Sequence, residues 1–584
     1  LGGGLATYNG AGALARAALV DERGWTITDG GPSPDDDGDG LSNAQEADLG
    51  TDPNEEDTDG DGLTDFDEVQ AGTDPLGWCG DGIIKAPEAC DEGMSSALCD
   101  ADCQEVTSFI SVWETSDDGE AVTLPLVAGY EYDFTVDWGD DSPVAEVTAF
   151  DDPDITHTYA TAGQYTVTID GVLETIRFVA APASEQLIAV PNLGHVGWTS
   201  FSQAFQDCER LTVVVGGDTS QVTTMQSMFM GATSVTPDTS GWDTSQVTSL
   251  GATFNDATVA TPDTTNWDTS NVTQMTLAFQ DATLATPDTS GWETSKVTDM
   301  SGMFRGASAA TPDTSGWDTS SATTMNRMFS GATVANPDTS GWDTSQVTDM
   351  GAMFEHTGAA TPDTSAWDTS NVTSMSTMFS YAQSATPATS GWDTSNVESM
   401  QYMFNNAPVA NPDTSGWDTS KVTGMEIMFN YALLATPDTS AWDTSQVTSM
   451  VFMFQGAGLA RPDTSGWDTS NVTDMRGMFH NASLATPVTS GWDTSQVTNM
   501  GAMFHNASLA TPDTSGWDTS KVTNMAQMFE DAVAATPHMS GWELANVVDM
   551  STMLKGIDIG EERYTALLIT LDAENENPGV VLDG

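Results

Sequence analysis

The sequence predicts a multidomain protein whose largest part is an α/β solenoid of about 14 turns of 25 residues each. Tryptophan recurs every 25 residues from Trp242 to Trp542, and phenylalanine keeps the same period from Phe229 to Phe529. The chain of 584 residues is also too long for one hydrophobic core. A fixed period of this length is typical of stacked units, each of which buries its apolar residues against its neighbours.

The unit around Trp492, TPVTSGWDTSQVTNMGAMFHNASLA, predicts how one turn folds. Its apolar residues follow one stripe of helical spacing: Val497, Met500, Met503, Phe504 and Ala507. This stripe predicts a short helix of two to three turns, N-capped by Ser495 or Thr498. The preceding segment is expected to be extended, and turns spaced like strands, ~4.8 Å apart, would form a rod of ~65 Å. The Met and Phe stripe is interpreted as shared core rather than as a cofactor site.

Proline recurs in the extended segment, for example at Pro262, Pro287 and Pro512. Because proline has no N–H to donate to a central ladder, the segment is expected to begin as polyproline-like chain. Regular pairing is expected only over its Thr-Ser positions.

Two aspartates also recur in each unit, as Asp513 and Asp518 do. Stacking would bring like charges ~4.8 Å apart, at a cost of roughly 1–3 kcal/mol per neighbouring pair. The first position is Ala388, Val488 or His538 in three units, whereas the second is Asp in nearly all units or Glu in two of them. We therefore predict a structural turn role for the second aspartate, with weak cation binding as the alternative.

The unit GWDTSxVTxMxxMFxxA resembles the repeat of the BspA-like surface leucine-rich-repeat family, over residues 193–556. The resemblance implies a leucine-rich-repeat-like solenoid, here residues 181–556, on an extracellular bacterial protein with adhesive or surface-structural roles. This chain has Thr and Pro where typical members have Leu. Residues 181–210 are expected to begin the stack, since Phe205 lies 24 residues before Phe229, and Cys208 is predicted to be a small buried thiol.

Residues 31–78 contain a duplicated acidic pattern, DDDGDGLSNAQE and DTDGDGLTDFDE. Both copies fit the twelve-residue calcium loop, with oxygens at positions 1, 3 and 5, a turn-forming Gly at 6, a carbonyl at 7 and a closing Glu at 12. The first predicted ligand set is Asp35, Asp37, Asp39, the Leu41 carbonyl, Asn43 and Glu46. The second is Asp57, Asp59, Asp61, the Leu63 carbonyl, Asp65 and Glu68. A disordered acidic linker is the alternative.

The GTDP turns that flank these loops, residues 50–53 and 72–75, make the segment similar to the bacterial thrombospondin type 3 repeat. That resemblance implies a spacer stiffened by Ca²⁺ rather than a calcium sensor.

Residues 79–105 contain Cys79, Cys90, Cys99 and Cys103. Four clustered cysteines beside acidic loops predict two disulfides in an oxidising compartment, with a zinc site as the alternative. The run CGDGIIKAPEACDEG resembles the small cysteine-rich repeat of secreted bacterial proteins.

Residues 106–180 alternate polar and apolar residues between turn signals, which predicts an antiparallel sandwich. The segments VDWGDDSP and THTYATAGQYTVTIDG resemble a PKD domain, an immunoglobulin-like β-sandwich. The resemblance implies a spacer or interaction module, and it places His157 in a structural position.

The chain carries 86 acidic and 14 basic side chains, a net charge of −72. Such a field repels nucleic acid and anionic lipid and attracts cations. No apolar run approaches 18 residues, so no membrane span is predicted. Because the chain starts at Leu1 without a signal peptide, it is expected to be a processed form or an excerpt of a longer precursor.

The two ends of the chain are predicted to belong together. Residues 557–584 supply a helix and a strand, a C-terminal half-cap, and residues 1–30 supply a helix near 12–22 and a strand near 25–28 that cannot fold alone. In related proteins a stretch like the first runs directly into a stretch like the second. Residues 1–30 could therefore cap the same chain, belong to one period of a tandem protein, or complete the solenoid of a neighbouring subunit.

These predictions together favour an extracellular bacterial structural protein, a head-to-tail filament or surface-layer component with a calcium-stiffened linker. The alternative is a cell-surface adhesin that binds a glycan or a host or cell-surface protein through a solenoid face carrying Tyr381, Tyr402 and Tyr431. An enzyme is not expected, because the histidines occupy unrelated repeat positions and offer no nucleophile–base pair. They include His195, His356, His480, His505 and His538.

Overall fold

The computed structural model describes residues 35–58, 64–71, 106–178 and 182–574, together with residue 19. The predicted elements within residues 1–30 and the cysteine-rich segment 79–105 therefore lie outside the described residues. The described elements are α2 (Asn43–Leu49), α3 (Asp65–Ala71), β1 (Phe109–Thr115), β2 (Ala121–Thr123), β3 (Tyr132–Asp137), β4 (Ala145–Val147), the 3₁₀ helix η2 (Pro153–Ile155), β5 (Thr156–Thr158), β6 (Gly163–Leu173), the 3₁₀ helix η3 (Pro182–Glu185), β7 (Leu187–Asn192) and α4 (Glu561–Glu574).

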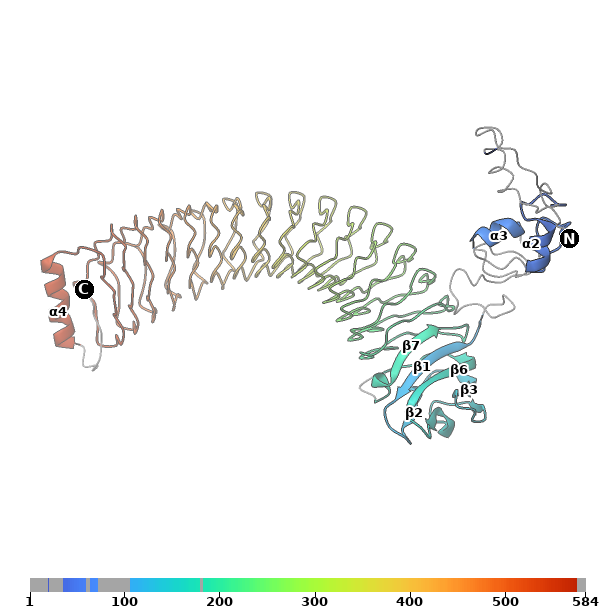
Figure 1. Cartoon of the computed structure of the whole chain (residues 1–584). Coiled ribbons are helices and arrows are strands. Elements are labelled where there is room, and N and C mark those ends of the chain that lie inside the picture. The colour runs from blue at the N-terminus through green and yellow to red at the C-terminus, as the bar shows by residue number, and fades with distance from the viewer. Residues whose placement is uncertain (1–18, 20–34, 59–63, 72–105, 179–181, 575–584) are drawn as a thin grey trace. The chain divides into compact units, whose positions relative to one another are not determined.

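The strands form a five-stranded sheet in the order β4-β3-β6-β1-β7 and a two-stranded sheet of β2 and β5 (Figure 1). Alternate residues of β1 are buried, so one face of the sheet covers a core. His157 stacks on Trp138 at 5.2 Å between ring centroids, and the Tyr159 hydroxyl donates to the Trp138 carbonyl at 2.9 Å. His157 is therefore part of this packing, as predicted.

The 25-residue units form coils that lie side by side in Figure 1. A single parallel bridge joins each coil to the next, from the Thr224–Ser249 pair to the Asn524–Asp549 pair. The backbone of each unit is thus joined by a β-bridge to the backbone of the next unit. The described residues therefore form a multidomain repeat protein. Its secondary structure is mostly strands, isolated β-bridges and turns, with few helices.

The helix predicted in each repeat is wrong, because the MxxMF segment is a series of turns in every coil of residues 199–556. The N–H of Ser227 donates to Gly251 O and that of Phe229 to Thr253 O, both at 2.8 Å, so alternate N–H groups point to the next coil. Ser227 and Gly231 also have φ of +54° and +73°, in the left-handed region that interrupts an α-helix. The stacked neighbour supplies the acceptors that an i−4 carbonyl would supply in a helix.

Threonine hydroxyls join the extended segments of neighbouring coils. Thr239 Oγ1 donates to the Asp263 carbonyl at 2.6 Å, and Thr244 Oγ1 donates to the Asp268 carbonyl at 3.0 Å. The same two hydrogen bonds recur along the stack, donated by the Thr hydroxyl of each Thr-Ser pair. This pattern agrees with the prediction that the proline-containing segments pair at their Thr-Ser positions.

The core of the stack consists of aromatic rings and methionines. The tryptophans from Trp242 to Trp542 are 2–4% exposed, and the methionines and phenylalanines between them are buried, except Phe452. Where neighbouring rings stack, the centroids are 6.3–6.4 Å apart for Trp pairs and 5.3–5.8 Å for Phe pairs, wider than the strand spacing we predicted. The coil-to-coil distance is thus set by side-chain packing as well as by backbone bonding.

Helix α4 follows the last coil at the residues where a helix was predicted, and its role as a half-cap stays a prediction. The strand predicted after it lies in residues 575–584, outside the described residues. On α4 only Leu567 is fully buried, while Leu568 and Ile569 are 45% and 65% exposed. None of the helices in the described ranges is both long enough and apolar enough to cross a lipid bilayer.

Candidate calcium centre

The first acidic loop leads into α2 through two glycine turns. Gly38 and Gly40 have φ of +88° and +117°, and a Cβ on Gly40 would lie 3.2 Å from the Phe66 ring. Ser42 then caps α2 in a reciprocal arrangement with Gln45. These turns fold the loop back on itself, so that the side chains at alternate positions converge.

The carboxylates of Asp35, Asp37 and Asp39 converge in this loop. Each offers an oxygen that lies within 4.8 Å of the oxygens offered by the other two. Asp35 accepts a hydrogen bond from the Gly38 N–H at 2.8 Å, and Asp39 accepts one from the Leu41 N–H at 2.7 Å. No cationic side chain of the described residues pairs with them, so their mutual repulsion is not offset by an internal ion pair.

Glu46, the last predicted ligand of the loop, is fully buried. Neither carboxylate oxygen has a hydrogen-bond partner among the described residues, and one oxygen of Asp37 has none either. Loss of water around Glu46, and next the charge of Asp37, raises its pKa to about 7. Desolvation also raises the pKa of Asp39. A buried carboxylate without a partner is costly unless a cation lies beside it.

The side chain of Asn43, the predicted ligand at position 9, is tied to the loop itself. Its Oδ1 accepts from the Asp36 N–H at 3.2 Å, and its Nδ2 donates to Asp36 Oδ2 at 2.7 Å. Asn43 therefore holds the start of the loop against α2. The position 9 residue of such loops often reaches the ion through a water molecule, which is compatible with this role.

The second loop is described only in part. Asp59, Asp61 and Leu63 lie outside the described residues, as does the side chain of Glu68. Asp65 is fully buried and accepts hydrogen bonds from the N–H and the hydroxyl of Thr58 at 2.8 and 2.7 Å. Asn43, at the same position of the first loop, bonds in the same way to the second residue of its loop, Asp36. Asp57 is described and has an interaction partner.

The two repeats contact one another at the first loop. Asp39 Oδ2 accepts from the Phe66 N–H at 2.9 Å, and the charge of Asp65 adds to the forces that raise the pKa of Glu46. Sequence reasoning treated the two loops as separate and did not identify Phe66. The tandem duplication could have suggested the contact, because two short helices without cores of their own need each other's surface.

The donor set of the first loop fits a hard divalent cation. Asp35, Asp37, Asp39 and Glu46 provide carboxylate oxygens, including the orphaned oxygens of two of them. Oxygen ligands of this kind and number are those that Ca²⁺ takes. A bound ion would offset both the repulsion of the three aspartates and the burial of Glu46.

A second group, His505, Glu530 and Asp531, also places its possible ligand atoms within 4.8 Å of one another. Here, however, Glu530 is satisfied internally, because Lys555 and Thr552 bond to its two oxygens, and Gln527 shares one of them. The Lys555 bond is the main reason why the pKa of Glu530 falls to about 2. The Glu530 carboxylate is therefore paired with the Lys555 ammonium group, whereas no cationic side chain of the described residues pairs with the carboxylates of the first loop.

The second recurring aspartate of the stack has the turn role that we predicted for it, and the first, for which we made no such prediction, accepts hydrogen bonds in a turn as well. Asp513 Oδ1 accepts from the N–H and the hydroxyl of Ser515 at 3.1 and 2.7 Å, and Asp518 Oδ1 accepts from the Ser520 N–H at 2.9 Å. The serine hydroxyl is the first cause, and the N–H the second, of the lowered pKa of both carboxyls. Cys208 is free and fully buried, as predicted, and burial raises the pKa of its thiol.

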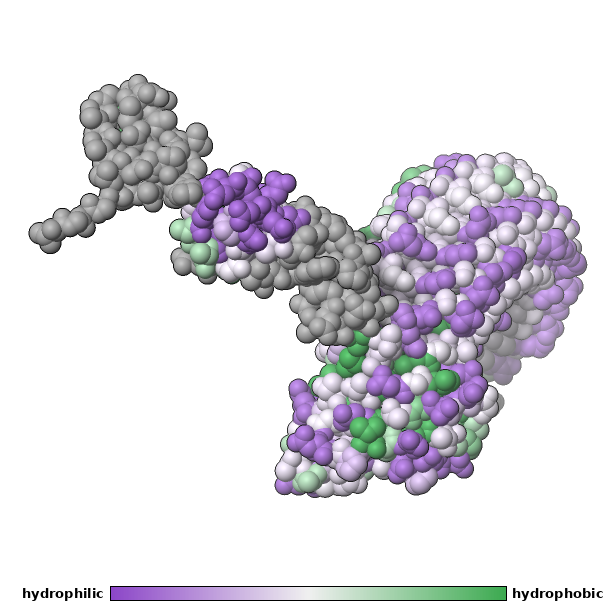
Figure 2. Space-filling view, turned by 90° about the vertical axis from the view of Figure 1, so that its right-hand side faces the viewer, coloured by the Kyte–Doolittle hydropathy of each residue, from purple (hydrophilic) through white to green (hydrophobic). Residues whose placement is uncertain are grey.

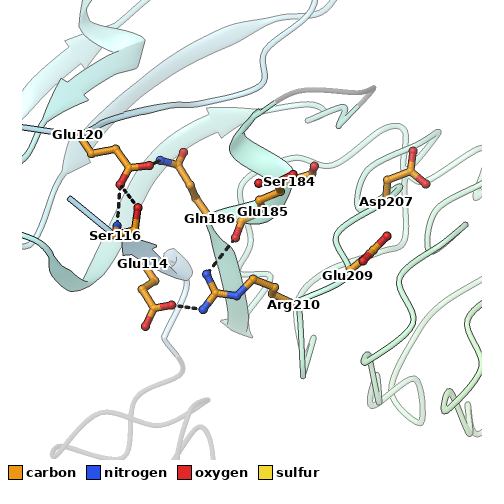
Figure 3. A pocket seen from close by; sticks show the side chains of 9 residues that line it. All are labelled: Glu114, Ser116, Glu120, Ser184, Glu185, Gln186, Asp207, Glu209 and Arg210. Atoms are coloured by element: carbon orange, nitrogen blue, oxygen red, sulfur yellow. Dashed lines mark hydrogen bonds and ion pairs between the residues drawn. The ribbon is translucent and has the colours of Figure 1, made fainter.

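A cavity of about 530 Å³ lies between the β-sheets and the first coil (Figure 3). Arg210 donates to Glu114 and to the Glu185 carbonyl, and Glu120 accepts from the Ser116 N–H, which with the Asp117 N–H lowers its pKa. The cavity is lined by Glu114, Ser116, Glu120, Ser184, Glu185, Gln186, Asp207, Glu209 and Arg210. Several of these side chains bond to one another: the Ser116 hydroxyl and Gln186 Nε2 donate to Glu120, and Arg210 donates to Glu114.

Two family models match the chain. The model described as "Mycoplasma protein of unknown function, DUF285" matches residues 199–314, 275–390, 355–466 and 458–565, which together cover more than half of the chain. The model of the bacterial TSP3 repeat matches residues 35–55 and 57–76. No curated protein matches the chain. The matches confirm a repeat protein with thrombospondin type 3-like repeats, whereas the PKD-like and cysteine-rich assignments stay predictions.

Proposed function

From the premise that the chain belongs to the DUF285 repeat family, we propose that it is an extracellular structural protein of a bacterial surface. Its repeats form a solenoid that serves as a rod, and its TSP3 repeats form a calcium-stiffened linker. Copies join head to tail, with residues 1–30 of one copy against residues 561–584 of the next. The two repeat families agree with the coarser statement, a surface-associated bacterial protein of structural or adhesive type.

The observation that carries this proposal is the unbroken bonding from coil to coil. Bridges join residue 190 to residue 214, and then every coil from residue 224 to residue 549 to its neighbour. Such a stack is stabilised by nearest-neighbour contacts and is stiff along its axis. It offers a long surface but a core that is filled by side chains, which suits a structural element better than a catalytic one.

The calcium centre supports the proposed linker. An ion held by Asp35, Asp37, Asp39 and Glu46 would fix a segment that has little apolar core of its own. The net charge of −72 would favour the cation further, since it concentrates counter-ions near the chain.

The end of the stack supports the proposed head-to-tail contact. In each coil alternate N–H groups donate to the next coil, but the coil that ends at Gly556 has no following coil among the described residues. Beside it, α4 exposes Leu568 and Ile569, and Val548 is 59% exposed. Exposed apolar groups at an open edge favour the addition of a further element.

Electron microscopy of the purified chain in excess Ca²⁺, and again after a chelator, tests the proposal. We expect filaments in Ca²⁺ whose repeat length matches one chain, and loss or bending of these filaments in chelator. Discrete monomers in Ca²⁺, with cross-links only between residues 1–30 and 561–584 of the same chain, would contradict it.

A second function is favoured by one observation on the stack. Tyr381, Tyr402 and Tyr431 are each about 40% exposed, although the repeated Trp and Phe rings of the stack are buried. Large aromatic rings on a rigid surface are typical of recognition sites. We therefore propose adhesion through this face as the alternative or additional function.

A further inference from the structure

Four successive coils share one kind of side chain at the positions that point away from the Met–Phe core. In residues 374–384, 399–409, 424–434 and 449–459, all of them described, the only charged side chain is Glu426. The two flanking coils each carry two charged residues in the same positions: Asp349 and Glu355 in one, Asp474 and Arg476 in the other. The segments 224–234 and 499–509 also lack Asp, Glu, Lys and Arg, so the aromatic rings, and not the lack of charge alone, distinguish these four coils.

Aromatic rings and amides replace the charges on this surface, which we call the tyrosine–amide face. Its rings are Tyr381, Tyr402, Tyr431 and Phe452. Its amides are Gln383, Gln401, Asn405, Asn406, Asn430 and Gln455. Leu434 and Leu459, 48% and 43% exposed, lie beside them in the sequence. Figure 2 shows that hydrophilic and near-neutral residues predominate on the side of the stack that it presents.

The rings lie on fixed supports. Gly456 stands where a Cβ would lie 2.6 Å from the Tyr431 ring, and Gly477 stands where a Cβ would collide with the Phe452 ring. Each ring therefore lies against the backbone of the following coil. Tyr381 stacks on His356 at 4.4 Å, with the rings 11° from parallel. Since one side of the Tyr431 ring is covered and the residue is 41% exposed, its other side faces solvent.

The amides are fixed in the same way. Asn430 Nδ2 donates to Asn405 Oδ1 at 2.9 Å, and Asn405 Nδ2 donates to Ser380 Oγ at 3.1 Å, so the row runs across three coils. Gln383 Nε2 donates to the carbonyls of Tyr381 and Asn406. These bonds orient the remaining amide groups without adding charge, and each amide has both donors and an acceptor.

We propose that the tyrosine–amide face binds a neutral polysaccharide. Flat rings with a free side pack against the C–H faces of sugar rings, and neighbouring amides and phenols exchange hydrogen bonds with sugar hydroxyls. The ligand is uncharged because the four segments carry no Lys or Arg and the net charge of −72 repels anions. The one guanidinium that lies over a ring of this face, that of Arg476, is already engaged with Phe452 at 5.2 Å from the ring centroid. A long chain ligand fits because the features recur from coil to coil. The inference names the ligand class of the second function proposed above and does not depend on filament formation.

An array of neutral and anionic oligosaccharides, probed with the full chain in excess Ca²⁺, tests the inference first. We expect binding to neutral members and none to the anionic ones. The strongest neutral ligand is then titrated calorimetrically against variants that borrow residues from equivalent positions in other coils. These are Tyr381→Asn and Tyr431→Asn, as in Asn481 and Asn506, and Tyr402→Ala, as in Ala352 and Ala502.

Each single variant should weaken binding at least about tenfold, and the triple variant should abolish it, since each ring loses one stacking contact. Tyr431→Phe, which keeps the ring, should stay within about threefold of the parent. Phe150→Ala, a change to an aromatic of similar exposure (41%) in the β-sheet region, is the matched control and should bind like the parent. Circular dichroism confirms that all variants fold.

Absence of neutral binding, binding to anionic glycans alone, or full binding by the triple variant would overturn the inference. So would a triple variant that changes sedimentation but not glycan binding, because the face would then be a contact between copies of the chain. Filaments that persist in any of these cases would leave the structural function standing.

Discussion

Two buried glutamates in this protein have opposite environments. Glu46, in the first acidic loop, has no hydrogen-bond partner for either oxygen among the described residues, and its pKa is raised to about 7. Glu530, in the stack, bonds to Lys555, Thr552 and Gln527, and its pKa is lowered to about 2. The stack satisfies Glu530 with its own side chains. In the loop, the carboxylate oxygens of Glu46 have no such partner. A cation bound from solution would therefore stabilise this site.

The largest effect is expected from the core of the stack, which should be independent of Ca²⁺. Trp392→Ala removes a ring that stacks between Trp367 and Trp417, and it should lower the free energy of unfolding of the stack by about 3–5 kcal/mol. Urea unfolding followed by tryptophan fluorescence measures this loss. An equal loss in Ca²⁺ and in chelator is expected, and a loss that Ca²⁺ reverses would break the distinction between the two regions.

Removal of Ca²⁺ should destabilise the loop segment and leave the stack unchanged. At a Ca²⁺ concentration 100 times the dissociation constant, binding contributes about 2.7 kcal/mol to the folded loops. Hydrogen exchange of residues 35–58 should accelerate about 100-fold in chelator, while residues 199–556 keep their protection. Exchange in the loops that ignores the chelator would rule out the calcium centre.

The two regions should respond to pH in opposite directions. The pKa of Glu46 is raised from 4.5 to about 7, so the chelated loop loses stability as pH rises through this range. The turn aspartates, Asp313 and Asp463 among them, have pKa values below 3.8, so their contribution to the stack is lost as pH falls below that value. Glu46→Gln should remove the first dependence and keep the second. Hydrogen exchange between pH 3 and pH 8 compares the regions, and parallel profiles would contradict the assignment.

The smallest effect is expected from a single turn of the stack. Asp518→Ala removes the acceptor for the Ser520 N–H and should cost less than about 1 kcal/mol, because the turn is exposed. Asp513→Ala should cost less still, since Ala388 and Val488 occupy that position naturally. Urea midpoints of the two variants measure the difference, and a larger cost for Asp513→Ala would show that the first position carries the turn.

Much of the candidate site could be predicted because metal loops carry their ligands at fixed local spacing. The pattern from Asp35 to Glu46 named Asp35, Asp37 and Asp39, whose carboxylates converge, and Glu46, whose pKa their charges raise. It could not name Phe66, whose N–H reaches Asp39 from the second repeat, because that contact depends on how two helices pack. Nor could it reveal that Glu46 is buried without partners, since burial is a property of the fold rather than of the spacing.

The sequence by itself determined the period, the aromatic and methionine core, the aspartate turns and the acidic loops. Each of these follows from residue type and local spacing, which act over a few bonds. The tertiary structure decided the conformation of the MxxMF segment, where the apolar spacing favoured a helix. In isolation Phe229 would find its acceptor within its own segment, but in the stack its N–H donates to the Thr253 carbonyl of the next coil. The neighbouring coil supplies a complete set of acceptors while it buries the same side chains, so stacking outweighs the local preference.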